Sequence, residues 1–198
     1  MKKVFTSVLM IGFLSISMSA LGKEKDFSLS FGKAEAETVK FEISNAKNVS
    51  VVIYNDFYGE LFSETFEDYN SVSKSYNFKD LDSGIYYLVL ESQQKIEKYK
   101  IKVDADKKVL IEKEPVSEIF KPEFLINGNM VTLQLSGVKN TAKISVTDFD
   151  DTVYYNATKS ATNGEIKLTF DLSKKTADSY IITVEENGRV FNKIIRVR

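Results

Sequence analysis

The sequence contains no cysteine, no histidine and no tryptophan, and only two of its 198 residues are proline. Without cysteine, the protein has no disulfide framework, no thiol nucleophile and no residue to which a bacterial lipoprotein lipid could be attached. Without histidine, it lacks the commonest general base near neutral pH and the commonest ligand of transition metals. The sequence therefore predicts a protein with no enzymatic activity and no cofactor.

Neither sign of charge dominates, because 27 basic residues face 28 acidic ones. The first 22 residues contain two of the lysines and no acid, so the remaining chain has a net charge of −3. Lysine and glutamate are interspersed along the chain, and no basic block is present of the kind that binds nucleic acid. We therefore expect no nucleic-acid partner.

The first 22 residues have the pattern of a secretory signal peptide. Met1–Lys3 gives a positive start, Val4–Met18 is mostly apolar, and small residues follow between positions 19 and 22. The alternative is an uncleaved membrane anchor, but the apolar run is short for a span of about 20 residues. We expect cleavage and an exported mature protein, periplasmic, outer-surface or extracellular, with no membrane span.

An internal repeat organises the rest of the chain. The segment Leu81–Val103 reads as a turn, a strand, a tight reversal and a second strand, and Tyr180–Val197 repeats it at an offset of 94. Upstream, Val39–Ile43 matches Val131–Leu135 at an offset of 92. The repeat predicts two domains, 23–113 and 114–198, after a signal peptide at 1–22.

Further matches at the offset of 92 include Asp56-Phe57 with Asp148-Phe149. Both prolines lie between the two copies, in the segment Glu112–Pro122, which we interpret as a linker. The sequence leaves open whether Val109–Ile111 ends the first domain or begins the second.

Apolar residues alternate with polar ones at a period of two, as in Val39, Phe41 and Ile43. This pattern is typical of antiparallel strands with one buried and one wet face. Asn-Gly pairs between such runs, as at Asn187-Gly188, are preferred hairpin turns. With about seven short strands in each copy, the predicted fold is all-β: two tandem immunoglobulin-like antiparallel β-sandwiches after the N-terminal signal peptide.

The segment Asp148–Thr152 follows an apolar strand and resembles the nucleophile motif of haloacid-dehalogenase phosphatases. The resemblance implies Asp148 as nucleophile and Asp150 as acid/base. That chemistry sits on a parallel sheet with crossover helices, which the alternating strands here do not predict, so we disfavour an Asp-based phosphatase. Asp148, Asp150 and Asp151 are also weak calcium candidates, although aspartate is a common turn former.

Aromatic residues offer a binding hypothesis. Phe57 and Tyr58 lie in a predicted turn of the first copy, and Phe149 lies in the matching turn of the second. Exposed rings anchor protein partners or stack on sugars, whereas the alternative is that they cover sheet edges. We expect a protein or glycan partner at the cell surface, bound through Phe57, Tyr58 and Phe149.

The hairpin also carries a family resemblance. The run Leu81-Asp-Ser-Gly-Ile-Tyr86, followed by the strand Lys95–Val103, resembles the Leu-x-x-Gly-x-Tyr hairpin of C-terminal sorting domains on type IX-secreted proteins. The resemblance covers about 55 residues of the first copy and is weaker in the second, although the final residues, 193–198, are similar to a sorting tail. The resemblance implies a small secreted β-sandwich, with sorting as an alternative function. The repeated units and their linker favour an exported binding, adhesion or structural module, which is the function we expect.

Overall fold

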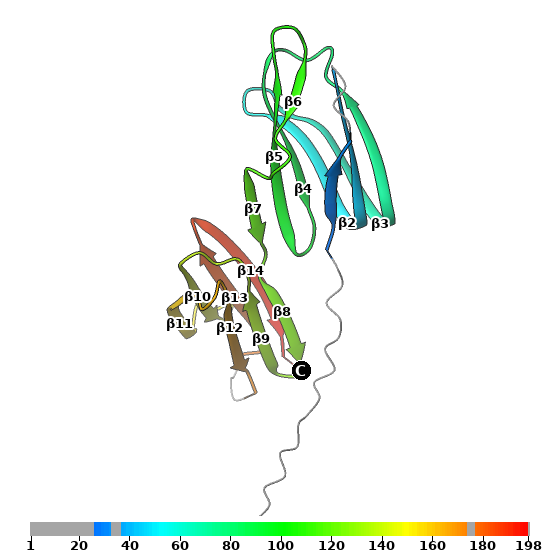
Figure 1. The fold of residues 1–198 in the computed structure, drawn as a ribbon. Coiled ribbons are helices and arrows are strands. Elements are labelled where there is room, and N and C mark those ends of the chain that lie inside the picture. The colour runs from blue at the N-terminus through cyan, green and yellow to red at the C-terminus, as the bar shows by residue number, and fades with distance from the viewer. Residues whose placement is uncertain (1–25, 33–36, 174–176, 198) are drawn as a thin grey trace, which may run out of the picture.

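The computed structural model describes residues 26–32, 37–173 and 177–197 (Figure 1). Within these ranges the chain forms fourteen strands and no helix, and every pairing between strands is antiparallel. The expected all-β, antiparallel fold is therefore confirmed. The signal peptide expected at 1–22 lies outside the described residues.

The first half of the chain forms one seven-stranded sheet. Its strands are β1 (Ser28–Phe31), β2 (Thr38–Asn55), β3 (Gly59–Asn77), β4 (Gly84–Glu91), β5 (Lys95–Val103), β6 (Val109–Ile111) and β7 (Ser117–Phe120). The order is β1-β2-β4-β5-β6, with β3 on β2 and β7 on β5. Both β6 and β7 thus pair with β5, so the segment between the prolines contains a strand of the first sheet.

The second half forms two smaller sheets. Its strands are β8 (Glu123–Asn127), β9 (Met130–Leu135), β10 (Thr141–Thr147), β11 (Val153–Ser160), β12 (Ile166–Asp171), β13 (Ser179–Glu186) and β14 (Arg189–Arg196). One sheet has the order β11-β10-β13-β14, and the other has the order β12-β9-β8. Only Lys121 and Pro122 separate β7 from β8.

Each half has its own cluster of buried apolar side chains. The alternation seen in the sequence places them: Tyr86, Leu88 and Leu90 of β4 point into the first core. Tyr180 and Ile182 of β13 do the same in the second core. Burial of apolar area at about 25 cal/mol per Å² provides the main stabilisation of such sandwiches, which have no disulfides to help.

A bend in β2 lets the two parts of this strand pair with different neighbours. Asn45 and Asn48 have positive φ angles of 56° and 50° within β2. The part before them pairs with β1, and the part after them pairs with β4. In the second half, Gly137 has a φ of 71° at the corresponding place, and the chain there passes from β9 in one sheet to β10 in the other. The strong curvature of β2 and β3 is visible in Figure 1.

The strand registers show which residues of the two halves occupy equivalent positions. Each long hairpin has one register shift, between Ile53 and Tyr54 in the first half and between Val146 and Thr147 in the second. These positions are 93 residues apart, so Asp148 stands where Asn55 does. The offset of 92 expected for this turn is one residue short, because the second half has an additional residue before β10.

Strand β7 connects the two halves (Figure 1). Its backbone pairs with β5 from Lys95 to Lys98. Its last residue, Phe120, lies against Gly137, where an added Cβ would come within 2.5 Å of the ring. The absence of a side chain at Gly137 is therefore required both by the left-handed backbone and by the close approach of Phe120.

Candidate functional site

The turn between β2 and β3 presents two exposed aromatic rings. Phe57 is 85% exposed and Tyr58 is 54% exposed, and their rings meet edge to face with centroids 4.9 Å apart. The Asn55 side chain holds the turn, because its oxygen accepts hydrogen bonds from the backbone N–H groups of Phe57 (2.8 Å) and Tyr58 (3.1 Å). Its amide nitrogen donates to the carbonyl of Ile85 at 2.7 Å, which ties the turn to β4.

The ring of Tyr58 is fixed by a second loop. Its hydroxyl donates to the Asp82 carboxylate at 2.8 Å. This hydrogen bond and the negative charge of Asp82 raise the pKa of Tyr58 above its usual value. The backbone carbonyl of the same Asp82 accepts a hydrogen bond from the buried Tyr86 hydroxyl at 2.7 Å. The Tyr58 ring is therefore held by hydrogen bonding, the Phe57 ring packs edge to face against it, and both remain open to solvent.

The equivalent turn of the second half is organised around Asp148. One carboxylate oxygen accepts hydrogen bonds from the N–H groups of Asp150 and Thr152, both at 2.9 Å, and the other accepts one from the Tyr154 hydroxyl at 2.8 Å. Burial opposes ionisation of Asp148, but these hydrogen bonds outweigh it and lower its pKa. The carboxylate is thus engaged in shaping the turn, as expected of an aspartate that replaces Asn55.

The other acidic residues of this turn are open to solvent. Asp150 and Asp151 are exposed, and Asp151 has a positive φ of 60°. Among the described residues, no group of three or more acidic side chains is arranged to hold a metal ion. Asp148, Asp150 and Asp151 are therefore not grouped as a metal site in the described part of the chain.

Phe149 is 63% exposed, like its counterparts in the first half. It lies between β10 and β11, however, and the ring contacts of the described residues join Phe57 to Tyr58 and leave Phe149 out. The structure thus brings two of the three predicted binding residues together, and it places the third on a different sheet.

The tyrosine of the hairpin motif forms a hydrogen bond to the chain just before its own strand. The Tyr86 hydroxyl reaches back to the carbonyl four residues upstream, and the Tyr180 hydroxyl accepts a hydrogen bond from the N–H of Ala177 at 3.1 Å. Such a tyrosine corner is a hallmark of immunoglobulin-like sandwiches. Gly84 is less constrained, because an added Cβ would meet only ordinary contacts at 3.9 and 4.0 Å. The second half accordingly has Asp178 at that position.

One aromatic pair inside each sandwich carries an unpartnered hydroxyl. Phe62 meets Tyr76 edge to face at 4.6 Å, and at the equivalent place Tyr155 meets Phe170 at 5.2 Å. In the first half the later residue of the pair, Tyr76, carries the hydroxyl, whereas in the second half the earlier residue, Tyr155, carries it. Both tyrosine hydroxyls are buried and have no hydrogen-bond partner within the described residues, and burial raises the pKa of Tyr76.

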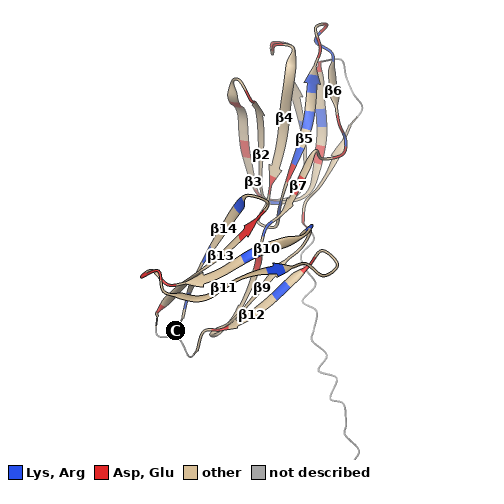
Figure 2. Cartoon of the chain, turned by 90° about the vertical axis from the view of Figure 1, so that its left-hand side faces the viewer, with Lys and Arg blue, Asp and Glu red and all other residues tan. Residues whose placement is uncertain are grey.

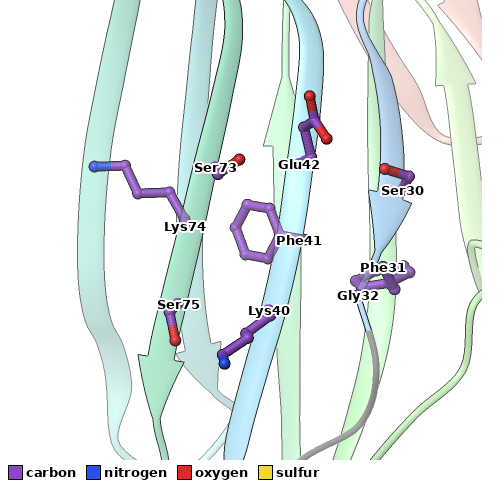
Figure 3. Close-up of a pocket in the computed structure, with 9 residues that line it drawn as sticks. All are labelled: Ser30, Phe31, Gly32, Lys40, Phe41, Glu42, Ser73, Lys74 and Ser75. Carbon is purple, nitrogen blue, oxygen red and sulfur yellow. The ribbon is translucent and has the colours of Figure 1, made fainter.

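A hollow of about 380 Å³ lies between β1, β2 and β3 (Figure 3). Phe41 lies in the middle of its lining residues, and the charged groups of Lys40, Glu42 and Lys74 point in different directions around it. Lys74 is already paired with Glu64 at 2.7 Å. The hollow therefore lacks a set of polar groups converging on one ligand.

A feature that the sequence analysis missed lies on the outer face of the first sheet. The Lys98 ammonium group lies 3.6 Å from the ring centroid of Tyr87 and 5.1 Å from that of Tyr54. The two rings are 5.2 Å apart. The signal in the sequence is the alternation of lysine with apolar residues along β5.

Comparison with known proteins gives a match to a protein family and likenesses to solved structures. No curated protein matches the chain. Among solved structures, the chain is similar to a chain described as "Biofilm associated protein - BSP domain", with 14% sequence identity and a TM-score of 0.28. The alignment covers 84% of this chain and 29% of the solved chain, so this chain spans less than a third of that protein's length.

The described residues contain no helix that is long and apolar enough to cross a membrane.

Residues 36–104 match the family of the secretion system C-terminal sorting domain. The matched segment runs from the start of β2 to the end of β5, and it includes the Leu81–Val103 hairpin and its tyrosine corner. The first half is therefore similar to the secretion system C-terminal sorting domain, as the hairpin residues indicate.

Proposed function

We propose that the protein is an exported, non-enzymatic binding module that contacts a partner at the bacterial surface through the Phe57–Tyr58 turn. The observation that carries the proposal is the exposure of an aromatic pair whose turn is anchored by hydrogen bonds. Phe57 is 85% exposed, yet its backbone and the neighbouring Tyr58 hydroxyl are both held by hydrogen bonds. Rigid aromatic anchors lose little conformational entropy on binding and dominate the energetics of many interfaces.

The match to the sorting domain supports the exported part of this proposal, since that family is described as a part of a secretion system. The arrangement around Asp148 supports the non-enzymatic part. Its carboxylate accepts two hydrogen bonds from its own turn and one from Tyr154 of β11, and no histidine or cysteine is present to act as a base or nucleophile.

Binding of the labelled, purified mature protein to whole cells of the source bacterium tests the role of the turn. We expect Phe57→Ala together with Tyr58→Ala to weaken binding at least tenfold, as loss of hot-spot aromatics does. Phe149→Ala is the matched control, because it removes an exposed ring from the equivalent turn. Unchanged binding by the double variant, or equal loss in the control, would refute the assignment of the site.

A second candidate function is export sorting, and the match at residues 36–104 favours the first half as the sorting element. This differs from the hypothesis that the final strands act as the tail. Fusion of residues 23–121 or of residues 122–198 to a secreted reporter distinguishes the two. Sorting by the first half predicts outer-surface delivery of the first fusion alone, and periplasmic retention of both fusions would eliminate sorting by either half.

A further inference from the structure

We propose that the outward face of β2, β4 and β5 binds an acidic polysaccharide. Lys98, Lys100 and Lys102 occupy three successive outward positions of β5, because the intervening Tyr99 and Ile101 are buried in the core. Figure 2 shows the lysine bands following one another along β5. Alternate residues of a strand are about 6.8 Å apart, so the face presents a row of cations with regular spacing.

The positive charge of this row is only partly neutralised within the chain. Lys100 forms an ion pair with Glu112 at 3.2 Å, and nearby Glu91 is paired with Lys121. Lys98 and Lys102 form no ion pair with any described residue. Two cations, separated by about 13.6 Å along the strand, are therefore available to a ligand that carries repeated negative charges.

Two tyrosine rings lie beside the row. Tyr54 and Tyr87 are direct cross-strand partners, and Tyr87 in turn pairs with Lys100. Lys98 lies over both rings. A sugar ring packs its C–H groups on tyrosine while its carboxylate meets the adjacent ammonium, so rings and cations together recognise an acidic sugar chain better than either does alone.

The second half lacks this combination at equivalent positions. Asn192 and Ile194 of β14 stand where Lys98 and Lys100 stand in β5, at the hairpin offset of 94. Ile181 of β13 replaces Tyr87. Arg196 keeps a cation at the position of Lys102, whereas Lys98, Lys100 and Tyr87 are specific to the first half and are not required by the shared fold.

The spacing of the cations favours a polysaccharide over a nucleic acid. A nucleic-acid strand carries one charge per about 3.4 Å, which is twice the density of the lysine row. The face is also built on strands and offers no protruding apolar helix for a lipid surface. It does not include Phe57 or Tyr58, so this inference stands independently of the proposed function.

Affinity electrophoresis of the mature protein through gels containing polygalacturonate, with neutral dextran as the reference, tests this site. We expect retardation by polygalacturonate alone, and weaker retardation at high salt because screening reduces the attraction. Lys98→Gln with Lys102→Gln should weaken binding at least tenfold. Tyr87→Ala should weaken it several-fold with no change in charge, and thermal unfolding verifies that each variant is folded.

The matched control is Lys167→Gln with Lys193→Gln, which removes the same charge from exposed strand positions of the second half. This variant should bind as the wild type does. Equal weakening in test and control variants would overturn the site, since it would show dependence on net charge alone. Absence of retardation, or tighter binding to single-stranded DNA or anionic vesicles than to polygalacturonate, would overturn it as well.

Discussion

At the scale of single residues, the buried hydroxyls of Tyr76 and Tyr155 are the clearest departures from a fully satisfied core. A buried polar group without a partner costs about 1–3 kcal/mol relative to its hydrated state. We therefore predict that Tyr76→Phe and Tyr155→Phe leave stability unchanged or raise it by about 1 kcal/mol. Urea unfolding gives the free energy of unfolding of each variant.

Tyr86→Phe serves as the contrast for these two variants. It removes the same atom from a ring whose hydroxyl donates to the Asp82 carbonyl. We expect it to lower the free energy of unfolding by about 1 kcal/mol, the usual net value of such a hydrogen bond. A loss of similar size for Tyr76→Phe would mean that its hydroxyl has a partner in solution.

Asp148 makes the free energy of unfolding depend on pH in the acidic range. Because its pKa is lower in the folded than in the unfolded state, its contribution is present above the usual carboxyl pKa near 4 and is lost as the pH falls further. Asp148→Asn should lower the melting temperature at neutral pH and reduce its decline in acid. Melting curves across this range test the prediction, with Asp150→Asn as a control that should behave as the wild type does.

At the scale of elements, the contact between β7 and Gly137 is the most demanding one. Gly137→Ala introduces a Cβ 2.5 Å from the Phe120 ring, at a residue with a φ of 71°. We predict a loss of at least about 1 kcal/mol, since alanine is strained at this φ even without the clash. Adding Phe120→Ala should cost less in this background than in the wild type, and strictly additive losses would contradict the contact.

The elements were predictable where local chemistry decides them. The alternation predicted the strands, and Asn187-Gly188 has the two positive φ angles that a tight hairpin requires. The bend at Asn45 and the pairing of β7 with β5 were not predictable, because both depend on which distant strands lie alongside. The same limit applied to the candidate site: exposure of Phe57 could be inferred from its turn, whereas Lys98 needed the neighbouring strands to become notable.

At the scale of the whole molecule, two core clusters support the proposal of two folding units, 23–113 and 114–198. Because β7 pairs with β5 beyond residue 113, the proposed boundary cuts through the first sheet. We predict that a fragment of residues 23–121 unfolds cooperatively and at a higher temperature than one of residues 23–113. Calorimetry of both fragments tests this, and a fragment 23–121 that is unfolded on its own would refute the idea of independent units.

Among the described strands, β3 pairs with β2 alone, so the other side of its nineteen residues has no neighbour from the described part of the chain. Such an edge invites self-association, and charge is a common natural deterrent. Here Glu60, Glu64, Glu67 and Asp68 provide it, against one lysine in the strand. Replacing these carboxylates by neutral amides would remove the repulsion between two such edges, and separate copies of the protein would then be able to pair along β3.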